Sequence, residues 1–429
     1  MTETRAILRS ALPLYVTMAV SSASALVSTA LLGRHGTASL AAFAVAAAVY
    51  VPVVTAVSGV MRGMMPYVTA AHDDPVALRR VLGSGRVLGL GIGGCGALVV
   101  LATPAVARAS GVDGAAVDGL GPLPPLLAAA VLAQSVSASA SSALVALDRG
   151  KLVMWAGLSG TAVTVLLSAL LTPRTGVSGA GIAMLASAVV VAVVARAGLH
   201  RRTGRPGRPD RREIVTLART GLPMAGTVLV KFAVLSVLTI AAARLGAAQA
   251  AAHGIGETLV NLIFTAAVAL GQATVPRVSA GGYRAARTAA ILALIGTGTL
   301  AGVLIVAGRW IVPVFSADPQ LRPDVVALLP LVGFAVVTDA LQAVYGFALL
   351  GLRNTLPSLF CTLIFFGLLA VVAVPAAEHG GLPLLWTALG VANLSQAAAK
   401  AFLYRRAAGK AKAAGKAEAD GQAEAAGTR

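Results

Sequence analysis

The sequence predicts an all-α integral membrane protein of about twelve transmembrane helices, built as two related six-helix bundles. Charged residues make up only 12% of its 429 residues, and the mean hydropathy is +0.85. Because soluble domains carry about 25% charged residues, this composition is too apolar for a soluble core. Apolar runs recur along the chain, and each reaches the roughly 20 residues that cross a bilayer. An internal repeat then relates the second six runs to the first six.

Twelve apolar segments separated by short polar loops account for most of the chain. Segments three and four are rich in Gly and Ser, so we expect them to face other helices or a cavity rather than lipid. The predicted spans are residues 10–32, 38–63, 82–104, 122–146, 151–172, 177–199, 215–243, 249–274, 288–311, 325–351, 355–376 and 382–404.

Basic residues fall mainly in alternate loops, as the positive-inside rule requires of cytoplasmic segments. The opposite loops hold few of them, and the loop between the last two spans holds none. An odd number of spans would destroy this alternation. The sequence therefore predicts a multi-pass protein of the plasma membrane with both termini in the cytoplasm. The basic residues on the predicted cytoplasmic side include Arg79, Arg80, Arg149, Lys151, Arg277, Arg284, Arg287, Arg353, Arg405 and Arg406.

Two polar segments divide the chain. Residues 200–213 contain six Arg with interspersed Pro and Gly, which prevent a continuous helix. We expect a cytoplasmic linker there, between an N-terminal bundle (1–199) and a C-terminal bundle (214–406). Residues 407–429 consist mostly of Ala, Gly, Lys and Glu without aromatic residues, so their composition predicts a disordered cytoplasmic tail.

The net charge of +18 does not indicate a nucleic-acid partner. Aromatic residues make up only 4% of the chain, and no basic face carries the aromatic platforms of single-strand binders. Cys95 and Cys361 lie inside apolar runs, so we expect neither a disulfide nor a metal site. The segment Gly89–Gly94 fits the dinucleotide fingerprint, but it has no preceding strand, and its small residues favour close helix packing. No catalytic set is placed together, so we expect no enzyme and no cofactor.

The internal repeat appears when the chain is shifted by 210 residues. Residues 12–70 then align with 222–280 without a gap, with 17 identities in 59 positions. The identities include Pro, Arg and Gly at matching places, so shared composition does not explain them. Each half has six spans, and the repeat is therefore parallel, as in transporters whose halves are related by an axis along the membrane normal.

Several short patterns resemble the multidrug and toxic compound extrusion (MATE) family over about residues 8–406. Gly33-Arg-His-Gly36 followed by Leu40-Ala-Ala42 is similar to the family's junction between helices 1 and 2. Arg244-Leu-Gly246 resembles the corresponding junction in the second half. Pro276-Arg-Val278 and Phe315-Ser-Ala-Asp318 resemble the segments that close helix 8 and precede helix 10, and Asp339-Ala-Leu-Gln342 with Gly351-Leu-Arg353 resembles the helix 10 pattern.

This resemblance implies two bundles around a central cavity and the export of small amphiphilic compounds, driven by inward movement of H⁺ or Na⁺. The sequence departs from the family at two charged positions. Many members carry an acid in helix 1, where this chain has Ser28. Another branch carries a Glu in helix 7, where this chain has Lys231, while the acid of helix 10 is present as Asp339. A Na⁺ site built on two carboxylates is therefore not expected, and H⁺ is the favoured coupling ion.

Charges at mid-membrane are costly and rarely face lipid, so we expect Lys231 and Asp339 to pair. Two interpretations remain open, a static structural ion pair and a pair switched by protonation. Glu257 lies one turn before Asn261 on the same helix face. It is either a water-accessible residue that lines the cavity, or a contact for cationic substrate or a substitute coupling site. Asp339, Lys231 and Glu257 are thus the candidate ion-coupling residues, and the candidate cavity residues are Asn261, Gln342, Gln134 and Ser28.

Two polar residues near span ends are expected at the membrane surface. Asn393, Gln396 and Lys400 follow one another at helical spacing in the last span, and Lys400, near its cytoplasmic end, is expected to extend to the membrane surface. His253 is near the end of a span and is expected to be interfacial.

The leading hypothesis is a proton-coupled secondary exporter that works by alternating access. We expect it to act as a monomer, with membrane lipid and a small amphiphilic substrate as its partners. A flippase for a lipid-linked precursor is an alternative, but those relatives often have about fourteen spans and an Arg-rich cavity. A non-transporting membrane scaffold or a membrane enzyme would need clustered catalytic groups, which the sequence lacks. Because Lys231 replaces an acid, anionic or neutral substrates are favoured more than is usual in the family.

Overall fold

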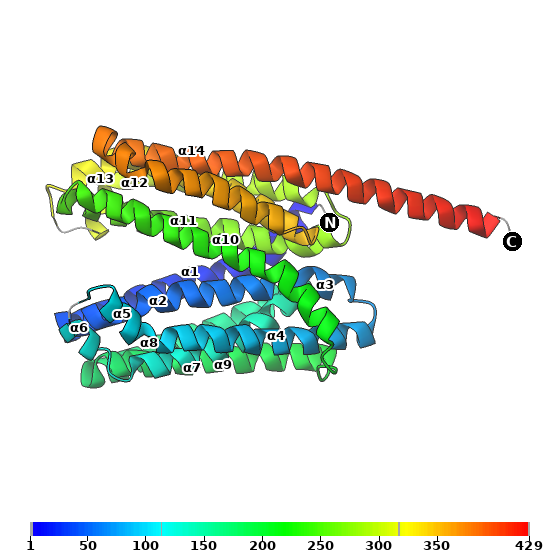
Figure 1. The fold of residues 1–429 in the computed structure, drawn as a ribbon, viewed down its shortest axis with the longest axis horizontal. Coiled ribbons are helices and arrows are strands. Elements are labelled where there is room, and N and C mark those ends of the chain that lie inside the picture. The colour runs from blue at the N-terminus through cyan, green and yellow to red at the C-terminus, as the bar shows by residue number, and fades with distance from the viewer. Residues whose placement is uncertain (1–2, 113, 316–317, 428–429) are drawn as a thin grey trace. The chain divides into compact units, whose positions relative to one another are not determined.

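The computed structural model describes residues 3–112, 114–315 and 318–427, which contain helices and no strand (Figure 1). The helices are α1 (Glu3–His35), α2 (Thr37–Arg62), α3 (Met65–Ala70), α4 (Pro75–Leu101), α5 (Thr103–Ala109), α6 (Gly114–Asp118), α7 (Leu123–Ala146), α8 (Gly150–Thr175), α9 (Val177–Thr203), α10 (Arg211–Arg244), α11 (Ala247–Ser279), α12 (Ala285–Phe315), α13 (Arg322–Gly351) and α14 (Leu356–Gly427).

Ten helices in the described part of the chain are long and apolar enough to cross a membrane. One of them, α14, is kinked at Gly381, whose φ of +60° interrupts the helix and separates two segments of spanning length. With α14 counted as two segments and with α1, which is 33 residues long, the described part of the chain contains twelve helical segments long enough to span a membrane, the number that the sequence predicts. The chain is an all-α membrane protein, as its composition predicts.

The helices cluster into two units, which do not coincide with the predicted bundle boundaries. The N-terminal unit is Leu8–Ala233, and the C-terminal unit combines Val234–Arg429 with Met1–Ile7. Helices α1 and α10 therefore contribute to both units. Helix α14 continues to Gly427, through the segment for which composition predicts disorder. The predicted boundaries and the disorder of the tail stay predictions.

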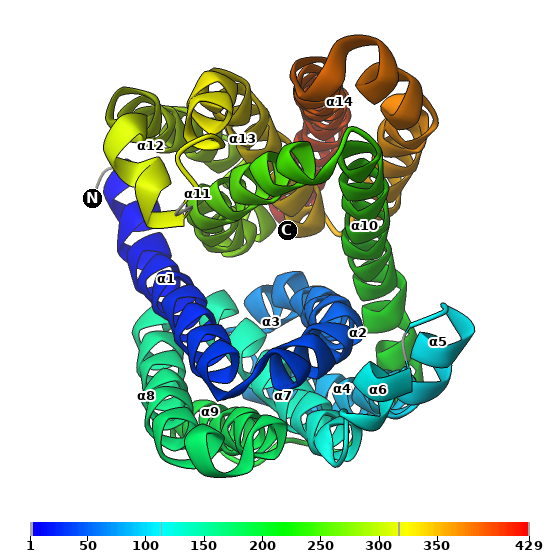
Figure 2. The ribbon, with the colours of Figure 1, turned by 90° about the vertical axis from the view of Figure 1, so that its left-hand side faces the viewer.

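The N-terminal unit is organised around α7, which packs against α2, α4 and α9, while α9 also packs against α8 (Figure 2). Glycines of α4 make these contacts close. A Cβ added to Gly93 would lie 2.6 Å from the Cβ of Ser135 on α7, and one added to Gly89 would lie 3.0 Å from the sulfur of Met61 on α2. A Cβ on Gly91 would meet nothing within 4 Å. The glycine motif in α4 therefore serves helix packing, as the sequence predicts.

The first turns of α10 also belong to the N-terminal unit and lie against the end of α2. A Cβ built on Gly63 would approach the Cα of Gly221 to 2.5 Å, so the two backbones are nearly in contact. Beside them, the hydroxyl of Tyr67 and that of Thr220 are 2.8 Å apart. Glycine is required at this crossing because any side chain would separate the helices.

In the C-terminal unit, α13 is the central helix. It packs against α11, α12 and α14, and its buried face is almost continuous from Val325 to Gly351. The start of α1 attaches to this unit, since Arg277 on α11 donates through Nη2 to the carbonyl of Ala6 at 2.7 Å. The largest buried side chains here include Trp386 and Phe366 on α14.

The internal repeat is visible in the backbone conformation of three junctions. Gly36 and Gly246, which precede the second helix of each half, have φ of +157° and +116°. Gly176 and Gly381, before the sixth helix of each half, have φ of +57° and +60°.

The third junction follows the fourth helix of each half, and it places residues other than glycine in the left-handed region. Asp148 has φ of +56° and Arg353 has φ of +58°. Both turns close in the same way, with the next amide donating to a carbonyl five residues back, from Arg149 to Leu144 at 2.8 Å and from Asn354 to Leu349 at 3.0 Å. The repeat therefore extends beyond the aligned residues 12–70.

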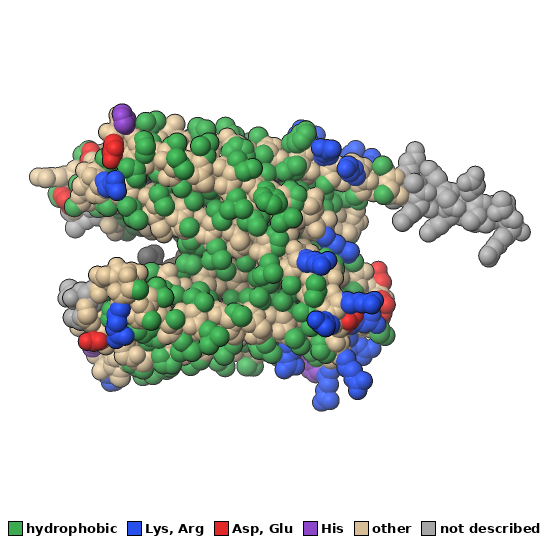
Figure 3. All heavy atoms as spheres, in the orientation of Figure 1, with side chains coloured by type: hydrophobic (Ala, Val, Ile, Leu, Met, Phe, Trp, Pro, Cys, Tyr) green, Lys and Arg blue, Asp and Glu red, His purple; other side chains and the backbone are tan. Residues whose placement is uncertain are grey.

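Basic side chains gather at one end of each unit, while the flanks are apolar (Figure 3). In the N-terminal unit, a cavity of about 470 Å³ at this end is lined by Arg9, His72, Arg149, Lys151 and Arg202. Arg9 of α1, the α3–α4 and α7–α8 loops and the end of α9 therefore lie together, as the predicted alternation of loops requires. Which side of the membrane this end faces stays a prediction.

At the same end, α4 begins with a side-chain cap. The carboxylate of Asp74 accepts hydrogen bonds from the backbone N–H groups of Val76 at 2.8 Å and Ala77 at 3.1 Å. These bonds favour the charged form, so they lower the pKa of Asp74 below its ordinary value. Asp74 is fully exposed to solvent, outside the membrane-spanning part of the chain.

Candidate functional site

Asp339 lies on the buried face of α13 in the C-terminal unit, where it is 2% exposed. One helical turn later, Gln342 donates through Nε2 to Oδ1 of Asp339 at 2.8 Å. The spacing of three residues places both side chains on the same face of the helix. The Oε1 atom of the same amide is not used in this hydrogen bond. Gln342 can therefore accept from a donor on another helix and connect that donor to the carboxylate.

That donor is Lys400 of α14, whose ammonium donates to Oε1 of Gln342 at 2.6 Å. Lys400 also donates to Thr362 Oγ1 at 3.1 Å and to Gln396 Oε1 at 3.3 Å. We call Asp339, Gln342, Lys400, Gln396 and Thr362 the buried polar cluster. It joins an acid and a base through one amide inside the C-terminal unit.

The burial of Lys400 contradicts the expectation that a lysine at this position extends to the membrane surface. Its side chain is only 1% exposed. The physical reason is that α14 does not end nearby. Arg405 and Arg406 are exposed one turn further along, and Lys400 faces α13. Asn393 lies on the same face and donates to the carbonyl of Ala335 on α13 at 3.3 Å. The spacing of Asn393, Gln396 and Lys400 was the sequence signal for this face.

Lys231 is half-buried on α10, in the part of that helix that belongs to the N-terminal unit. Asp339 belongs to the C-terminal unit. The pairing of these two residues therefore stays a prediction. What the structure adds is that Asp339 already has a hydrogen-bonded route to a different lysine within its own unit.

Glu257 lies near the start of α11 beside a buried histidine. The Oε1 atom of Glu257 is 3.3 Å from Nε2 of His253, an ion-pair distance without the angle of a hydrogen bond. The His253 side chain is 1% exposed and packs against Trp386, with ring centroids 5.4 Å apart, whereas Glu257 is 26% exposed. An interfacial position for His253, expected from its place near the end of a span, is therefore wrong, because Trp386 of α14 covers it.

The candidate cavity residues are dispersed. Ser28 on α1 is buried, and its hydroxyl is 3.4 Å from that of Ser168 on α8. Gln134 on α7 is half-buried, and Asn261 on α11 is exposed. Only Gln342 joins the buried polar cluster. Whether any of these side chains contacts a substrate stays a prediction.

Within the described residues, no group of three or more His, Cys, Asp and Glu side chains could hold a metal ion. Cys95 is an exposed free thiol and Cys361 a buried one. The charged groups that remain inside the C-terminal unit are those of the buried polar cluster and the Glu257–His253 pair. These groups lie on α11, α13 and α14, three of the helices long and apolar enough to cross a membrane.

In the described residues, twelve helical segments of membrane-spanning length in two repeated sets of six, with buried charges in one set, define a multi-pass membrane protein with a transporter-type architecture. The chain belongs to the multidrug and toxic compound extrusion (MATE) family. The family model MatE matches residues 223–375. The chain is 30% identical over 446 residues to "Probable multidrug resistance protein NorM" of Deinococcus radiodurans, which covers 95% of this chain and 97% of that protein. Over 394 residues it is 29% identical to a protein of the same description from Aromatoleum aromaticum, covering 83% and 82%.

Solved structures of the family share the fold. "Crystal structure of MATE in the straight conformation" superposes with a TM-score of 0.88 at 18% identity, covering 96% of this chain and 97% of that one. A structure described as the outward-facing conformation of a multidrug resistance MATE family transporter of the MOP superfamily gives a TM-score of 0.87. The family consists of transporters, so the chain is a transporter and not an enzyme.

Proposed function

We propose that this protein is a secondary active exporter of small amphiphilic compounds, driven by protons and working by alternating access. The observation that carries the proposal is the buried polar cluster of the C-terminal unit. An Asp and a Lys inside a membrane protein are costly, and such residues mark ion or proton pathways. Membership of the MATE family supports efflux as the activity, and the names of the relatives support drug-like substrates.

The coupling proton is carried by Asp339. A charged carboxylate in a low-dielectric interior is stabilised by its hydrogen bond from Gln342 and, through that amide, by the ammonium of Lys400. Protonation removes the negative charge and turns the acceptor into a possible donor, so the contact with Gln342 must rearrange. The rearrangement changes the packing between α13 and α14. Proton binding and helix movement are thereby linked.

Sodium is the less suitable coupling ion for this cluster. Hard cations require several oxygen ligands at once. At Asp339 the amide of Gln342 presents an N–H donor to the carboxylate, and its oxygen is taken by Lys400. A Na⁺ ion would have to displace both contacts while lying near an ammonium group. A proton needs no such coordination shell.

The experiment is transport in proteoliposomes with H⁺ and Na⁺ gradients imposed separately. We expect a pH gradient to drive accumulation of a fluorescent amphiphilic substrate, and Asp339→Asn to abolish that response. The matched control is Asp324→Asn, which changes an exposed acid at the start of the same helix and should keep transport. Accumulation driven by Na⁺ alone, or unchanged proton-driven transport in Asp339→Asn, would disprove the coupling mechanism.

Substrate charge is the second part of the proposal. Lys231 stands where a branch of the family has an acid, so anionic or neutral compounds should be exported more readily than is usual. We expect Lys231→Glu to raise the export of a cationic dye relative to an acidic compound of similar size. An unchanged ratio of the two rates would refute this preference.

The orientation follows from the basic ends of the helices. We propose that both termini face the cytoplasm of the cell, since exposed Arg and Lys gather at the end of the N-terminal unit that holds Arg9, only a few residues from the N-terminus. An epitope tag at either terminus should be protected from protease in intact cells. Cleavage of the tag in intact cells would reverse the assignment.

A further inference from the structure

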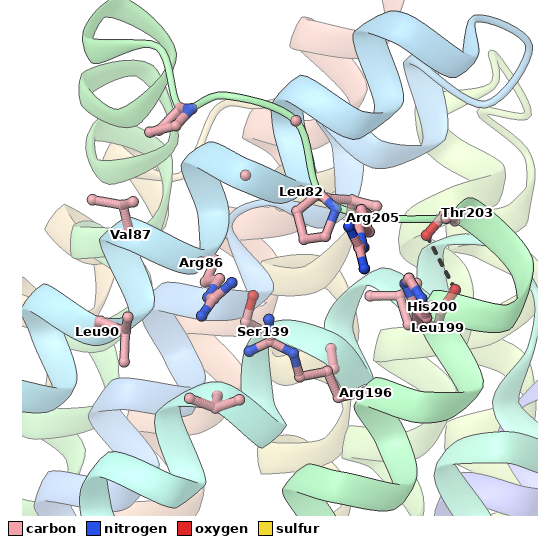
Figure 4. Close-up of a pocket in the computed structure, with 17 residues that line it drawn as sticks. Leu82, Arg86, Val87, Leu90, Ser139, Arg196, Leu199, His200, Thr203 and Arg205 are labelled. Carbon is pink, nitrogen blue, oxygen red and sulfur yellow. Dashed lines mark hydrogen bonds between the residues drawn. The ribbon is translucent and has the colours of Figure 1, made fainter.

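A second polar site lies in the N-terminal unit, far along the chain from the buried polar cluster. It is a cavity of about 620 Å³ between α4, α7, α9 and the linker that follows α9 (Figure 4). We call it the linker pocket. Its polar lining comes from Arg86 on α4, Ser139 on α7, Arg196, His200 and Thr203 on α9, and Arg205 in the linker.

The linker pocket is positively charged. Figure 4 shows Arg86 and Arg196 pointing toward each other beside Ser139. Three guanidinium groups line the cavity and no acidic side chain does. Arg86, Arg196 and Arg205 form no ion pair with a carboxylate in the described residues. Like charges at such short range repel one another, so the arrangement favours an anion that binds between them.

The nearest acids along the linker have other partners. Glu213 accepts a hydrogen bond from the hydroxyl of Ser84 through Oε2 at 3.0 Å. The backbone N–H of Asp210 donates to the same hydroxyl at 3.0 Å, and the carboxylate of Asp210 accepts from the N–H of Arg212 at 3.1 Å. Both acids thus serve the start of α10. They leave the charge of the linker pocket uncompensated.

The linker wall of the pocket is fixed by backbone contacts. The N–H of Gly207 donates to the carbonyl of Arg79 at 2.7 Å. A Cβ on Gly83 would meet the carbonyl oxygen of Gly207, so the linker lies directly on the backbone of α4. Pro206 and Pro209 restrict the chain on either side of this contact. A wall held in this way supplies a preformed site, because little ordering is left for the ligand to cause.

One side of the pocket is apolar and faces outward. Val87 and Leu90, on the same helix as Arg86, are 44% and 42% exposed, and both line the cavity. Exposed Val and Leu on a helix long and apolar enough to cross a membrane offer a surface on which a lipid chain can pack. The linker pocket therefore offers positive charge at its linker end and an apolar path beside it. A ligand that matches both parts has an anionic phosphate and a hydrocarbon chain.

We propose that the linker pocket binds an anionic phospholipid, with its phosphate between Arg86 and Arg196 and an acyl chain along Val87 and Leu90. Arginine suits this role because its planar group donates two parallel hydrogen bonds to phosphate oxygens. Basic pockets between membrane helices bind such headgroups in general. The bound phosphate joins α4 to α9 beside the linker. The proposal does not depend on what the protein transports.

The test uses the full-length protein in nanodiscs of phosphatidylcholine with increasing phosphatidylglycerol, and native mass spectrometry counts the retained lipids. We expect one phosphatidylglycerol to be retained in preference to phosphatidylcholine. The double variant Arg86→Gln/Arg196→Gln should weaken that preference by roughly tenfold or more. The matched control, Arg201→Gln, removes an exposed charge of α9 that does not line the pocket and should keep the preference.

Three outcomes would overturn the proposal. One is equal retention of the two lipids by the unmodified protein. Another is a loss in Arg201→Gln as large as in the double variant, which would indicate general surface charge. The third is complete displacement of the lipid by millimolar inorganic phosphate, which would assign the site to a free anion. If the double variant does not fold, Arg205→Gln in the linker replaces it, with the same expected loss of preference.

Discussion

Replacing Lys400 by Met removes the ammonium of the buried polar cluster while keeping most of the side-chain volume. Gln342 Oε1 then loses its donor, and an unsatisfied buried acceptor costs about 1–3 kcal/mol. Gln396 Oε1 keeps the hydroxyl of Thr362 at 3.0 Å, so its loss is smaller, about 0.5–1.5 kcal/mol. Removing the ammonium also relieves the penalty of burying a charge, which offsets part of both losses.

The expected net loss in the free energy of unfolding is therefore about 1–4 kcal/mol. It can be measured by denaturation with sodium dodecyl sulfate in mixed micelles, followed by circular dichroism. The control is Lys410→Met, an exposed lysine of the same helix, which should change stability by about 0.5 kcal/mol or less. A Lys400→Met variant as stable as the unmodified protein, or more stable, would refute the reasoning, because relief of charge burial would then outweigh the lost contacts.

Three further predictions concern packing, capping and coupling. Gly93→Ala should lower the free energy of unfolding by about 1–3 kcal/mol, because its Cβ would lie 2.6 Å from a side-chain carbon of α7. Gly91→Ala on the same helix is the control and should be neutral or stabilising, because its Cβ would meet nothing. Equal effects of the two variants in micelle denaturation would contradict this. Asp74→Ala should reduce stability at neutral pH. The difference should start to shrink as the pH falls through the ordinary Asp range near about 4 and be lost only below the lowered pKa of folded Asp74, because the folded carboxylate keeps its charge down to that pKa; a difference that is unchanged in strong acid would count against the cap. Glu257→Gln should retain proton-driven transport that Asp339→Asn loses, and its failure in the same proteoliposomes would make Glu257 the coupling acid instead.

The spans could be predicted because the length of each apolar run sets the position of a span, and helix-ending residues set its limits. The predicted span 177–199 begins at the first residue of α9, and 122–146 ends at the last residue of α7. The short helices α3, α5 and α6 were not predicted, because five to seven residues are too few for periodicity to separate a helix from a loop.

The candidate site was predicted only in part. Composition and spacing identify charged and polar residues inside spans, and Asp339 and Gln342 were among them. They do not say which face of a helix meets which neighbour. Lys400 and His253 were misplaced because each lies near the end of an apolar run, and their burial depends on contacts with α13 and with Trp386 respectively. Such contacts join residues more than fifty positions apart, beyond the reach of local pattern.

The matched turns also have an evolutionary consequence. Asp148 and Arg353 differ in charge and size, yet both adopt the same left-handed conformation after the fourth helix of their half. Duplication of a gene for one six-helix ancestor accounts for this agreement. It implies that the backbone conformation of the turn was retained while its side chain changed. The ancestor would have worked as a pair of identical subunits, each with the same ionisable groups. After fusion the two halves no longer had to be identical. The acid and the lysine of the buried polar cluster could then be present in the second half alone.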